Sequence, residues 1–189
     1  MNKQKHLKYS NYLKKRNFKG LIYRNFFLYP KIAKHLSGKC LDIGCGIGDF
    51  LKFRGKETYG IDINENTIEY CKSQNLNVKI FDEIIPYPYE TFDSILLDNV
   101  LEHIDKPNIL FKEILRVLNK KGKLLIGVPG VKGFKFDPDH KIYYDENKLD
   151  KVIDYNFYKK LKIFYTPFKS NFLNKNLKQY CMYGLFEKK

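Results

Sequence analysis

The residues best suited to chemistry lie in segment 41–50, which reads LDIGCGIGDF. This stretch combines an acidic residue, a cysteine and alternating glycines: Asp42, Gly44, Cys45, Gly46 and Gly48. Glycines let the chain turn sharply and let a ligand approach the backbone where a Cβ atom would block it. A helix that begins after the turn offers free N–H groups to that ligand. The segment therefore predicts a ligand-binding turn between a strand and a helix.

Two further carboxylates follow at the ends of later apolar segments. Asp62 and Ile63 lie about twenty residues after Asp42, the separation at which an acidic residue can accept both ribose hydroxyls of a nucleoside. The alternative is that Asp62 caps the helix that follows. Asp82 ends the next apolar segment, where it either reaches an adenine amino group or lies in a turn.

The elements that position these residues are indicated by apolar runs that alternate with helix-like segments from Lys39 onward. This alternation is typical of a parallel sheet covered on both faces. The expected strands are residues 40–43, 58–61, 77–81, 94–97 and 122–128. The expected helices are residues 48–53, 65–73 and 108–118, the last with apolar residues at helical spacing. The glycine turn and both carboxylates thus come at strand ends.

The two ends of the chain flank this region. Residues 6–28, rich in tyrosine and phenylalanine, are expected to form one or two helices that stop before Pro30. This segment either covers the binding cleft or packs as ordinary core. After the sheet we expect a short helix at 146–153, then two strands at 157–165 and 178–187 joined by a long polar loop. The predicted organisation is an N-terminal helical segment, residues 1–35, and one domain, residues 36–189.

In order and spacing, residues 40–129 resemble class I S-adenosylmethionine-dependent methyltransferases. The glycine turn and Asp62 are similar to that family's first motif and its following acidic position. The resemblance continues through Phe92 and Asp93, segment 97–103 (LDNVLEH) and segment 115–129 (LRVLNKKGKLLIGVP). The Leu-Glu-His after the fourth strand looks most like a small-molecule branch that includes ubiquinone-type and surface-glycan methyltransferases.

This resemblance implies an α/β, Rossmann-like, doubly wound and mainly parallel seven-stranded sheet with a C-terminal antiparallel hairpin. It makes residues 36–189 a methyltransferase domain and residues 1–35 a candidate lid. It also implies S-adenosylmethionine as the cofactor, bound across the carboxyl ends of the strands. The residues that it assigns to the cofactor are Asp42, Gly44, Cys45, Gly46, Gly48, Asp62, Ile63, Asp82, Asp98 and Asn99.

Each of these residues has an expected role by the same resemblance. The glycines, with the backbone of Cys45, shape the turn against the methionine end, and Asp42 fixes that turn by accepting backbone N–H groups. Asp62 holds the ribose and Asp82 faces the adenine. Just past the fourth strand, Asp98 and Asn99 line the methyl region.

Methyl transfer from a sulfonium depends mainly on in-line positioning of the acceptor. A hydroxyl acceptor must also lose its proton, for which His103 and His140 are the candidates. In similar enzymes the histidine of Leu-Glu-His is often structural, while His140, on the loop after the fifth strand, is a candidate base or acceptor contact. We expect a small-molecule or glycan acceptor, first a sugar or sugar-nucleotide hydroxyl and second a quinone or lipid-like phenol.

The net charge of +14 is concentrated at the two ends of the chain. Residues 1–35 carry ten Lys or Arg and no acid, and residues 151–189 carry nine against two, which leaves −3 for the middle. The basic ends are either a solvated charge run or a rim that attracts a phosphorylated, lipid-linked or membrane-associated acceptor. With no apolar run near the ~20 residues of a membrane span and no signal-peptide pattern, a cytoplasmic location is expected.

Other function classes fit the sequence less well. The G-x-G-x-G spacing and the C-terminal hairpin argue against a nicotinamide-dependent oxidoreductase. The fourth strand ends in Leu97-Asp98-Asn99-Val100 and lacks the Pro-Pro-aromatic signature of base-amino methyltransferases, so nucleic acid is an unlikely partner, although RNA stays open as an acceptor. A non-catalytic protein that binds cofactor or a partner also stays open. The four cysteines form no CxxC pair, and no metal site is expected.

Overall fold

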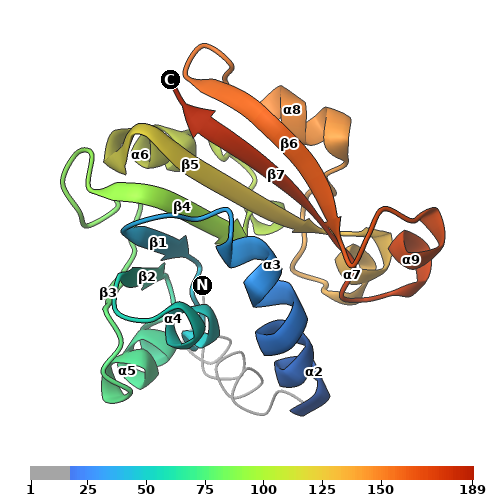
Figure 1. The fold of residues 1–189 in the computed structure, drawn as a ribbon, viewed down its shortest axis with the longest axis horizontal. Coiled ribbons are helices and arrows are strands. Elements are labelled where there is room, and N and C mark those ends of the chain that lie inside the picture. The colour runs from blue at the N-terminus through green and yellow to red at the C-terminus, as the bar shows by residue number, and fades with distance from the viewer. Residues whose placement is uncertain (1–17) are drawn as a thin grey trace.

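Seven strands form one sheet in the computed structural model, which describes residues 18–189 (Figure 1). The strands are β1 Cys40–Ile43, β2 Thr58–Asp62, β3 Val78–Ile80, β4 Phe92–Asp98, β5 Leu118–Pro129, β6 Tyr158–Thr166 and β7 Cys181–Lys188. Their order is β3-β2-β1-β4-β5-β7-β6. The strands β1 to β5 are parallel, and β7 runs antiparallel to both β5 and β6. The expected mainly parallel sheet with a C-terminal antiparallel hairpin is confirmed.

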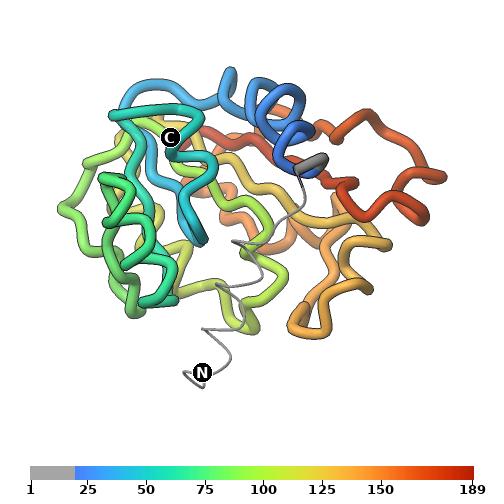
Figure 2. Tube along the Cα trace, turned by 90° about the horizontal axis from the view of Figure 1, so that it is seen from below, coloured from blue at the N-terminus to red at the C-terminus, as the bar shows by residue number. Residues whose placement is uncertain are grey.

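Helices cover both faces of this sheet. The described helices are α2 Phe18–Tyr23, α3 Tyr29–Ala33, α4 Asp49–Arg54, α5 Glu65–Ser73, α6 Asn108–Val117, α7 Val131–Phe136, α8 Glu146–Val152 and α9 Asn171–Asn176. Ile32 of α3 and Phe50 of α4 belong to the core on one face, and Ile114 of α6 and Leu149 of α8 to the core on the other. Figure 2, seen from below, shows α2 and α7 on opposite sides of the sheet.

The central strands are apolar on both sides because both of their faces are covered. In β4, Leu96 packs in the core beneath α3 and α4, whereas its neighbours Ile95 and Leu97 pack in the core beneath α6 and α8. Successive side chains of a strand point to opposite faces. A run such as Ser-Ile-Leu-Leu is therefore the pattern of a buried parallel strand.

One border of the sheet is formed by β6, whose only strand neighbour is β7. Residues 159–162 of this strand are exposed and read KKLK. The opposite border is β3, which has three residues. Both borders therefore differ from the central strands in length or in composition.

The N-terminal helix does not stop before Pro30, so that prediction was wrong. A π-helical turn at Arg24–Leu28 links α2 to α3, and the amide of Tyr29 donates to the carbonyl of Arg24, five residues back. Pro30 occupies the first turn of α3. There its missing N–H is tolerated, since the preceding wide turn has already displaced the regular hydrogen-bonding pattern. Residues 6–17 of the expected helical segment lie outside the described residues.

Two short helices were not predicted. The segment after β5 forms α7, and the expected polar loop between β6 and β7 contains α9. Ser170 caps α9, because its hydroxyl oxygen accepts a hydrogen bond from the amide of Leu173. Each has six residues, too few for an apolar periodicity to stand out. The expected 146–153 helix is confirmed as α8, with Asp145 as its cap.

Candidate functional site

The glycine-rich turn connects β1 to α4. Gly44, Gly46 and Gly48 all have positive φ angles, of 76°, 54° and 74°. A Cβ atom on Gly44 would lie 2.4 Å from Val100 Cγ2, and one on Gly48 would lie 2.4 Å from Leu76 Cδ1. Glycine is therefore required at both positions by backbone conformation and by space.

Asp62 holds this turn against the end of β2. Its Oδ2 accepts the amide of Gly46 at 2.8 Å, and its Oδ1 accepts the amide of Asn64 at 2.8 Å. The cap of α5 is Asn64, which accepts the amide of Asn66. The alternative reading of Asp62 as a helix cap was therefore wrong, and its carboxylate faces the glycine turn.

Asp42 differs from its expected role. The amides of Gly44 and Cys45 donate to the carbonyl of Ile61, at 2.8 and 3.1 Å, and the amide of Gly46 donates to Asp62. These turn amides therefore do not bond Asp42, because β2 lies closer to them. Cys45 is buried, and the role of its backbone at the site stays a prediction.

Carboxylates from three adjacent strands converge near this turn. Asp42 lies in β1, Asp62 ends β2 and Asp98 ends β4. Burial raises the pKa of Asp42 well above its usual value, and the negative charges of Asp98 and Asp62 raise it further. A cationic ligand placed among these groups would relieve this repulsion.

Asp98 and Asn99 are fixed by the antiparallel part of the sheet. The hydroxyl of Tyr183 donates to Asp98 Oδ1 at 2.8 Å, and the side-chain amide of Asn99 donates to the same oxygen at 3.0 Å. Asn99 has a φ of 57°, and its backbone amide donates to Gly127 at 2.9 Å. This left-handed conformation leaves Asn99 exposed beyond the end of β4.

The expected adenine end lies beside β3. The amide of Phe81 donates to the carbonyl of Asp62, which places Asp82 at the same border as Asp62. Asp82 is exposed, as are the apolar side chains of Ile63 and Ile84, at 53% and 69%. Exposed apolar side chains next to a carboxylate suit a flat heteroaromatic ring that also carries an amino group.

The side chains of His103 and His140 are in contact, and the carboxylate of Glu102 lies beside His140. The two imidazole rings lie 4.6 Å apart in a T-shaped contact, and His140 Nε2 lies 3.6 Å from Glu102 Oε1. Burial raises the pKa of Glu102 to about 8, while burial and the neighbouring His140 lower that of His103. Glu102 was not predicted as a site residue. Its place in Leu-Glu-His was the available signal.

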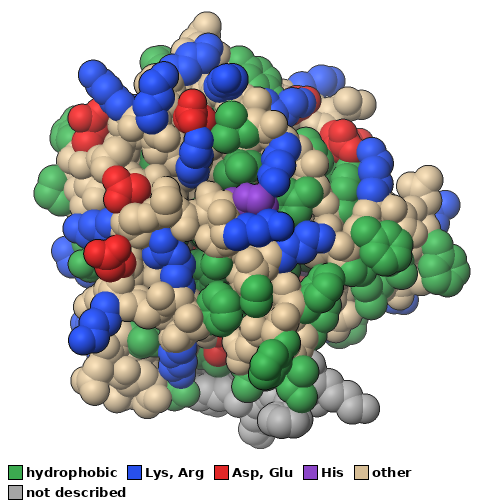
Figure 3. Space-filling model, viewed as in Figure 1, with side chains coloured by type: hydrophobic (Ala, Val, Ile, Leu, Met, Phe, Trp, Pro, Cys, Tyr) green, Lys and Arg blue, Asp and Glu red, His purple; other side chains and the backbone are tan. Residues whose placement is uncertain are grey.

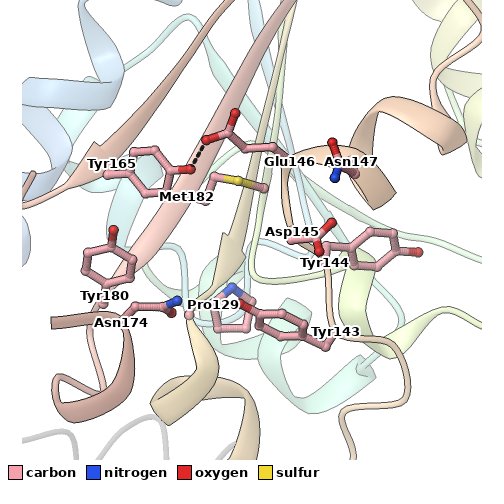
Figure 4. Close-up of a pocket in the computed structure, with 11 residues that line it drawn as sticks. Pro129, Tyr143, Tyr144, Asp145, Glu146, Asn147, Tyr165, Asn174, Tyr180 and Met182 are labelled. Atoms are coloured by element: carbon pink, nitrogen blue, oxygen red, sulfur yellow. Dashed lines mark hydrogen bonds between the residues drawn. The ribbon is translucent and has the colours of Figure 1, made fainter. Parts of the chain in front are cut away.

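A separate cavity of about 320 Å³ opens next to the end of β5 (Figure 4). Four tyrosines line it, Tyr143, Tyr144, Tyr165 and Tyr180, together with Met182 and Glu146. Glu146 accepts hydrogen bonds from the Tyr165 hydroxyl and from the Lys169 ammonium. The cavity adjoins the histidine cluster through Phe134, whose ring contacts both Tyr143 and His140.

Comparisons with known proteins agree with this geometry. Residues 41–126 match the model of a family described as a methyltransferase domain. An uncharacterized protein of Methanocaldococcus jannaschii is 34% identical over 100 residues, which are 51% of this chain and 48% of that protein. The ubiquinone biosynthesis O-methyltransferase of Coxiella burnetii is 32% identical over 100 residues, 47% of this chain and 43% of that protein. The chain thus spans about half, or less, of the length of these relatives.

A solved structure shows the likeness over nearly the whole chain. The S-adenosylmethionine-dependent methyltransferase of Thermotoga maritima is 18% identical, with a TM-score of 0.70, and the match covers 96% of this chain and 98% of that one. Among the described residues, no helix is long and apolar enough to cross a membrane. The chain therefore has the same fold as that methyltransferase structure, and its residues 41–126 are similar to a methyltransferase domain.

Proposed function

We propose that this chain transfers a methyl group from S-adenosylmethionine to a hydroxyl group of a small-molecule or glycan acceptor. The observation that carries the proposal is the placement of Glu102 and His103 directly after Asp98 and Asn99, at the carboxyl end of β4, where His140 joins them from the loop after α7. Proton-accepting groups are thus close in the chain to the residues assigned to the methyl region. An acceptor that must lose a proton needs such groups.

The residues at the glycine turn fit the cofactor. Three carboxylates and a backbone free of Cβ atoms suit a ligand with cationic sulfonium and amino groups. Asp42, Gly44, Cys45, Gly46 and Gly48 would border its methionine end. The ribose would lie at Asp62, the adenine between Ile63 and Asp82, and the methyl region at Asp98 and Asn99.

When bound, the cofactor supplies a methyl group on a positively charged sulfur, which is already electrophilic. The protein's own contribution is to orient the acceptor oxygen and to take up its proton. His140 and His103 would serve that step. The Nδ1 atoms of His103 and His140 lie 3.3 and 2.9 Å from backbone carbonyls, and His140 Nε2 faces Glu102 at 3.6 Å.

The acceptor that we favour is a sugar or sugar-nucleotide hydroxyl. The cavity of Figure 4 combines tyrosine rings with the polar side chains of Glu146 and Asn174, a mixture that suits a ring with apolar faces and hydroxyl edges. Lysine and arginine side chains are numerous on the face shown in Figure 3, which would favour a phosphorylated acceptor. A quinone-like phenol is the second candidate, because the Coxiella burnetii relative is named for ubiquinone biosynthesis.

In the N-terminal segment, residues 1–35, the described part from Phe18 onward would cover the acceptor. Its described part brings Tyr23 near the site, because the charge of Asp98 contributes to the raised pKa of Tyr23, whose main cause is burial. Phe26 is 80% exposed and Phe27 is 42% exposed. Such side chains would gain contacts if an acceptor lay beneath them. We further propose that the domain acts in the cytoplasm and that its basic ends can approach a membrane surface.

Calorimetric titration with S-adenosylmethionine and S-adenosylhomocysteine tests the cofactor site. We expect a micromolar dissociation constant, at least about 30-fold weaker in Asp62→Ala because a buried hydrogen-bonding carboxylate is lost. Asp105→Ala is the control, since Asp105 is exposed and pairs with Lys141 away from the turn. Folded wild-type protein that binds neither compound would end the proposal.

Transfer of a labelled methyl group then tests the acceptor. Nucleotide sugars, a catechol and an RNA are offered in parallel, and labelled sugar is the expected product. Labelled catechol with unlabelled sugar would move the proposal to the phenol class, and labelled RNA would overturn both.

A further inference from the structure

A buried carboxylate lies beside two imidazoles, and its oxygens have no hydrogen-bond partner among the described residues. Glu102 and His103 belong to the 3-10 turn Leu101–His103, and His140 follows α7 on the loop that starts at Asp137. One ligand-type atom from each of the three residues lies within 4.8 Å of the others. The backbone of the two segments is joined because the amides of Lys141 and Ile142 both donate to the carbonyl of Glu102.

Glu102 is the unusual member of this cluster. Its side chain is fully buried, and neither carboxylate oxygen has a hydrogen-bond partner among the described residues. His140 Nε2 lies 3.6 Å from Glu102 Oε1, which is beyond hydrogen-bond distance. A buried carboxylate is costly unless it is paired or binds a metal.

Both histidines are oriented by their other nitrogen atom. His103 Nδ1 lies 3.3 Å from the carbonyl of Asp139, and His140 Nδ1 lies 2.9 Å from the carbonyl of Phe134. A proton on Nδ1 in each ring satisfies these carbonyls and leaves a lone pair on Nε2. This is how metal-binding imidazoles are held in proteins, with the second nitrogen donating to a backbone carbonyl.

We propose that Glu102, His103 and His140 bind one divalent transition-metal cation of the zinc class. Two imidazole nitrogens and one carboxylate oxygen form the ligand set of zinc sites that keep an open position. Zinc bonds of about 2.0–2.1 Å put ligand atoms about 3.3 Å apart, close to the 3.6 Å between His140 Nε2 and Glu102 Oε1. The ligand atom of His103 lies within 4.8 Å of the other two, so His103 would have to move closer, a shift available to a side chain whose Nδ1 contact is itself long, at 3.3 Å.

The consequence of this site rests on the proposed function, although the binding itself does not. A cation lowers the pKa of an oxygen that binds to it, so an acceptor hydroxyl at the open position would lose its proton more easily. With the cation bound, the two imidazoles are ligands, so the proton-accepting role proposed above for His103 and His140 applies to the metal-free site only, and the proton passes to another base. The carboxylate of Asp137, 4.0 Å from His140 Nε2, stands beside this position and is half-exposed.

Metal binding is tested on the full-length chain, purified without a polyhistidine tag and treated with a chelator. Zn²⁺ is titrated by calorimetry, and Co²⁺ is used as a visible-absorption probe of coordination. We expect one equivalent of each and a Co²⁺ spectrum typical of four or five ligands. His140→Ala and Glu102→Gln should weaken binding by about 100-fold or more, and Glu102→Gln keeps the shape of the side chain so that folding is preserved.

His35→Ala is the matched control, because His35 lies after α3 and its ring contacts Phe164 in a tilted arrangement, away from the cluster. Its metal affinity should equal that of the wild type. The proposal is overturned if wild-type protein takes up no Zn²⁺ or Co²⁺, or if His35→Ala loses as much affinity as His140→Ala. Titration of the same samples with S-adenosylhomocysteine separates this outcome from failure of the proposed function, since cofactor binding does not need the cluster.

Discussion

The hydroxyl of Tyr183, in β7, donates a 2.8 Å hydrogen bond to Asp98, at the end of β4. The two strands are not neighbours, because β5 lies between them. The bond crosses β5 at Gly127, which is paired with Tyr183 in the antiparallel register and with Asp98 in the parallel one. The C-terminal hairpin thus reaches the methyl region of the proposed cofactor site.

Removal of this hydroxyl should destabilise the protein. Tyr183→Phe leaves Asp98 without one of its donors, and we expect a loss of about 1–2 kcal/mol in the free energy of unfolding, measured by urea denaturation. Tyr158→Phe is the control, since the Tyr158 hydroxyl is buried with no hydrogen-bond partner in the described residues, and it should be neutral or stabilising. Equal effects of the two changes would contradict the role given to the Tyr183 hydroxyl.

A methyl group at Gly127 should disrupt the hydrogen bond between Tyr183 and Asp98, which passes over this residue. A Cβ atom there would lie 2.4 Å from Tyr183 Cε1 and 2.6 Å from Asp98 Oδ1. For Gly127→Ala we expect a destabilisation of about 2–3 kcal/mol together with weaker binding of S-adenosylhomocysteine, measured by denaturation and calorimetry. Gly20→Ala, in the open surface of α2, should instead be neutral or stabilising by up to about 1 kcal/mol.

Substitution of a glycine in the turn should weaken cofactor binding directly, and not only by lowering the stability of the protein. Gly44→Ala places a Cβ atom 2.4 Å from Val100 Cγ2 in a backbone conformation with a φ of 76°. We expect at least about a tenfold weaker dissociation constant for S-adenosylhomocysteine, corresponding to about 1.4 kcal/mol. Gly55→Ala has the same kind of strain, with a φ of 90°, but no atom within 4 Å. The affinity of Gly55→Ala for S-adenosylhomocysteine should stay at the wild-type value. A loss of affinity equal to that of Gly44→Ala would indicate general destabilisation and contradict the prediction.

The stability of the protein in acid should depend on His35. Burial lowers the pKa of His35 to about 4, helped by Lys162 and Lys34. A histidine with a lowered pKa contributes its stability above the ordinary value near 6.5 and loses it as the pH falls toward 4. We expect the melting temperature of the wild type to fall relative to His35→Gln across this range. A constant difference between the two proteins from pH 7 to pH 4 would contradict this assignment.

Much of the fold could be predicted because its signals are local. The apolar run of β4 and the glycine spacing after β1 each occupy fewer than about ten consecutive residues, as buried parallel strands and ligand-binding turns do. The short strand ends were less exact, since β3 begins at Val78 rather than residue 77 and β4 extends to Asp98. The end of a strand depends on its hydrogen bonds to the neighbouring strand, and the residues of the strand alone do not indicate where those bonds stop.

The residues that escaped prediction depend on contacts between distant segments. The Tyr183 hydroxyl reaches Asp98 only through the register of an antiparallel strand 85 positions away. Glu102 acquires its importance from burial and from His140, which arrives on a different loop. Pro30 predicted the end of a helix. The π-helical turn at Arg24–Leu28, which lets the helix continue through Pro30, is not indicated by any local sequence pattern.

The lysine-rich border of the sheet has a consequence for how molecules of this protein meet. An edge strand presents unpaired backbone groups to which another strand could bond. A second copy that approached β6 edge to edge would bring its own Lys159 and Lys162 against those of the first, and each of these side chains is exposed. Like charges at this distance repel, more strongly at low ionic strength. The same lysines that make the C-terminal end basic therefore stop the sheet from growing from one molecule to the next.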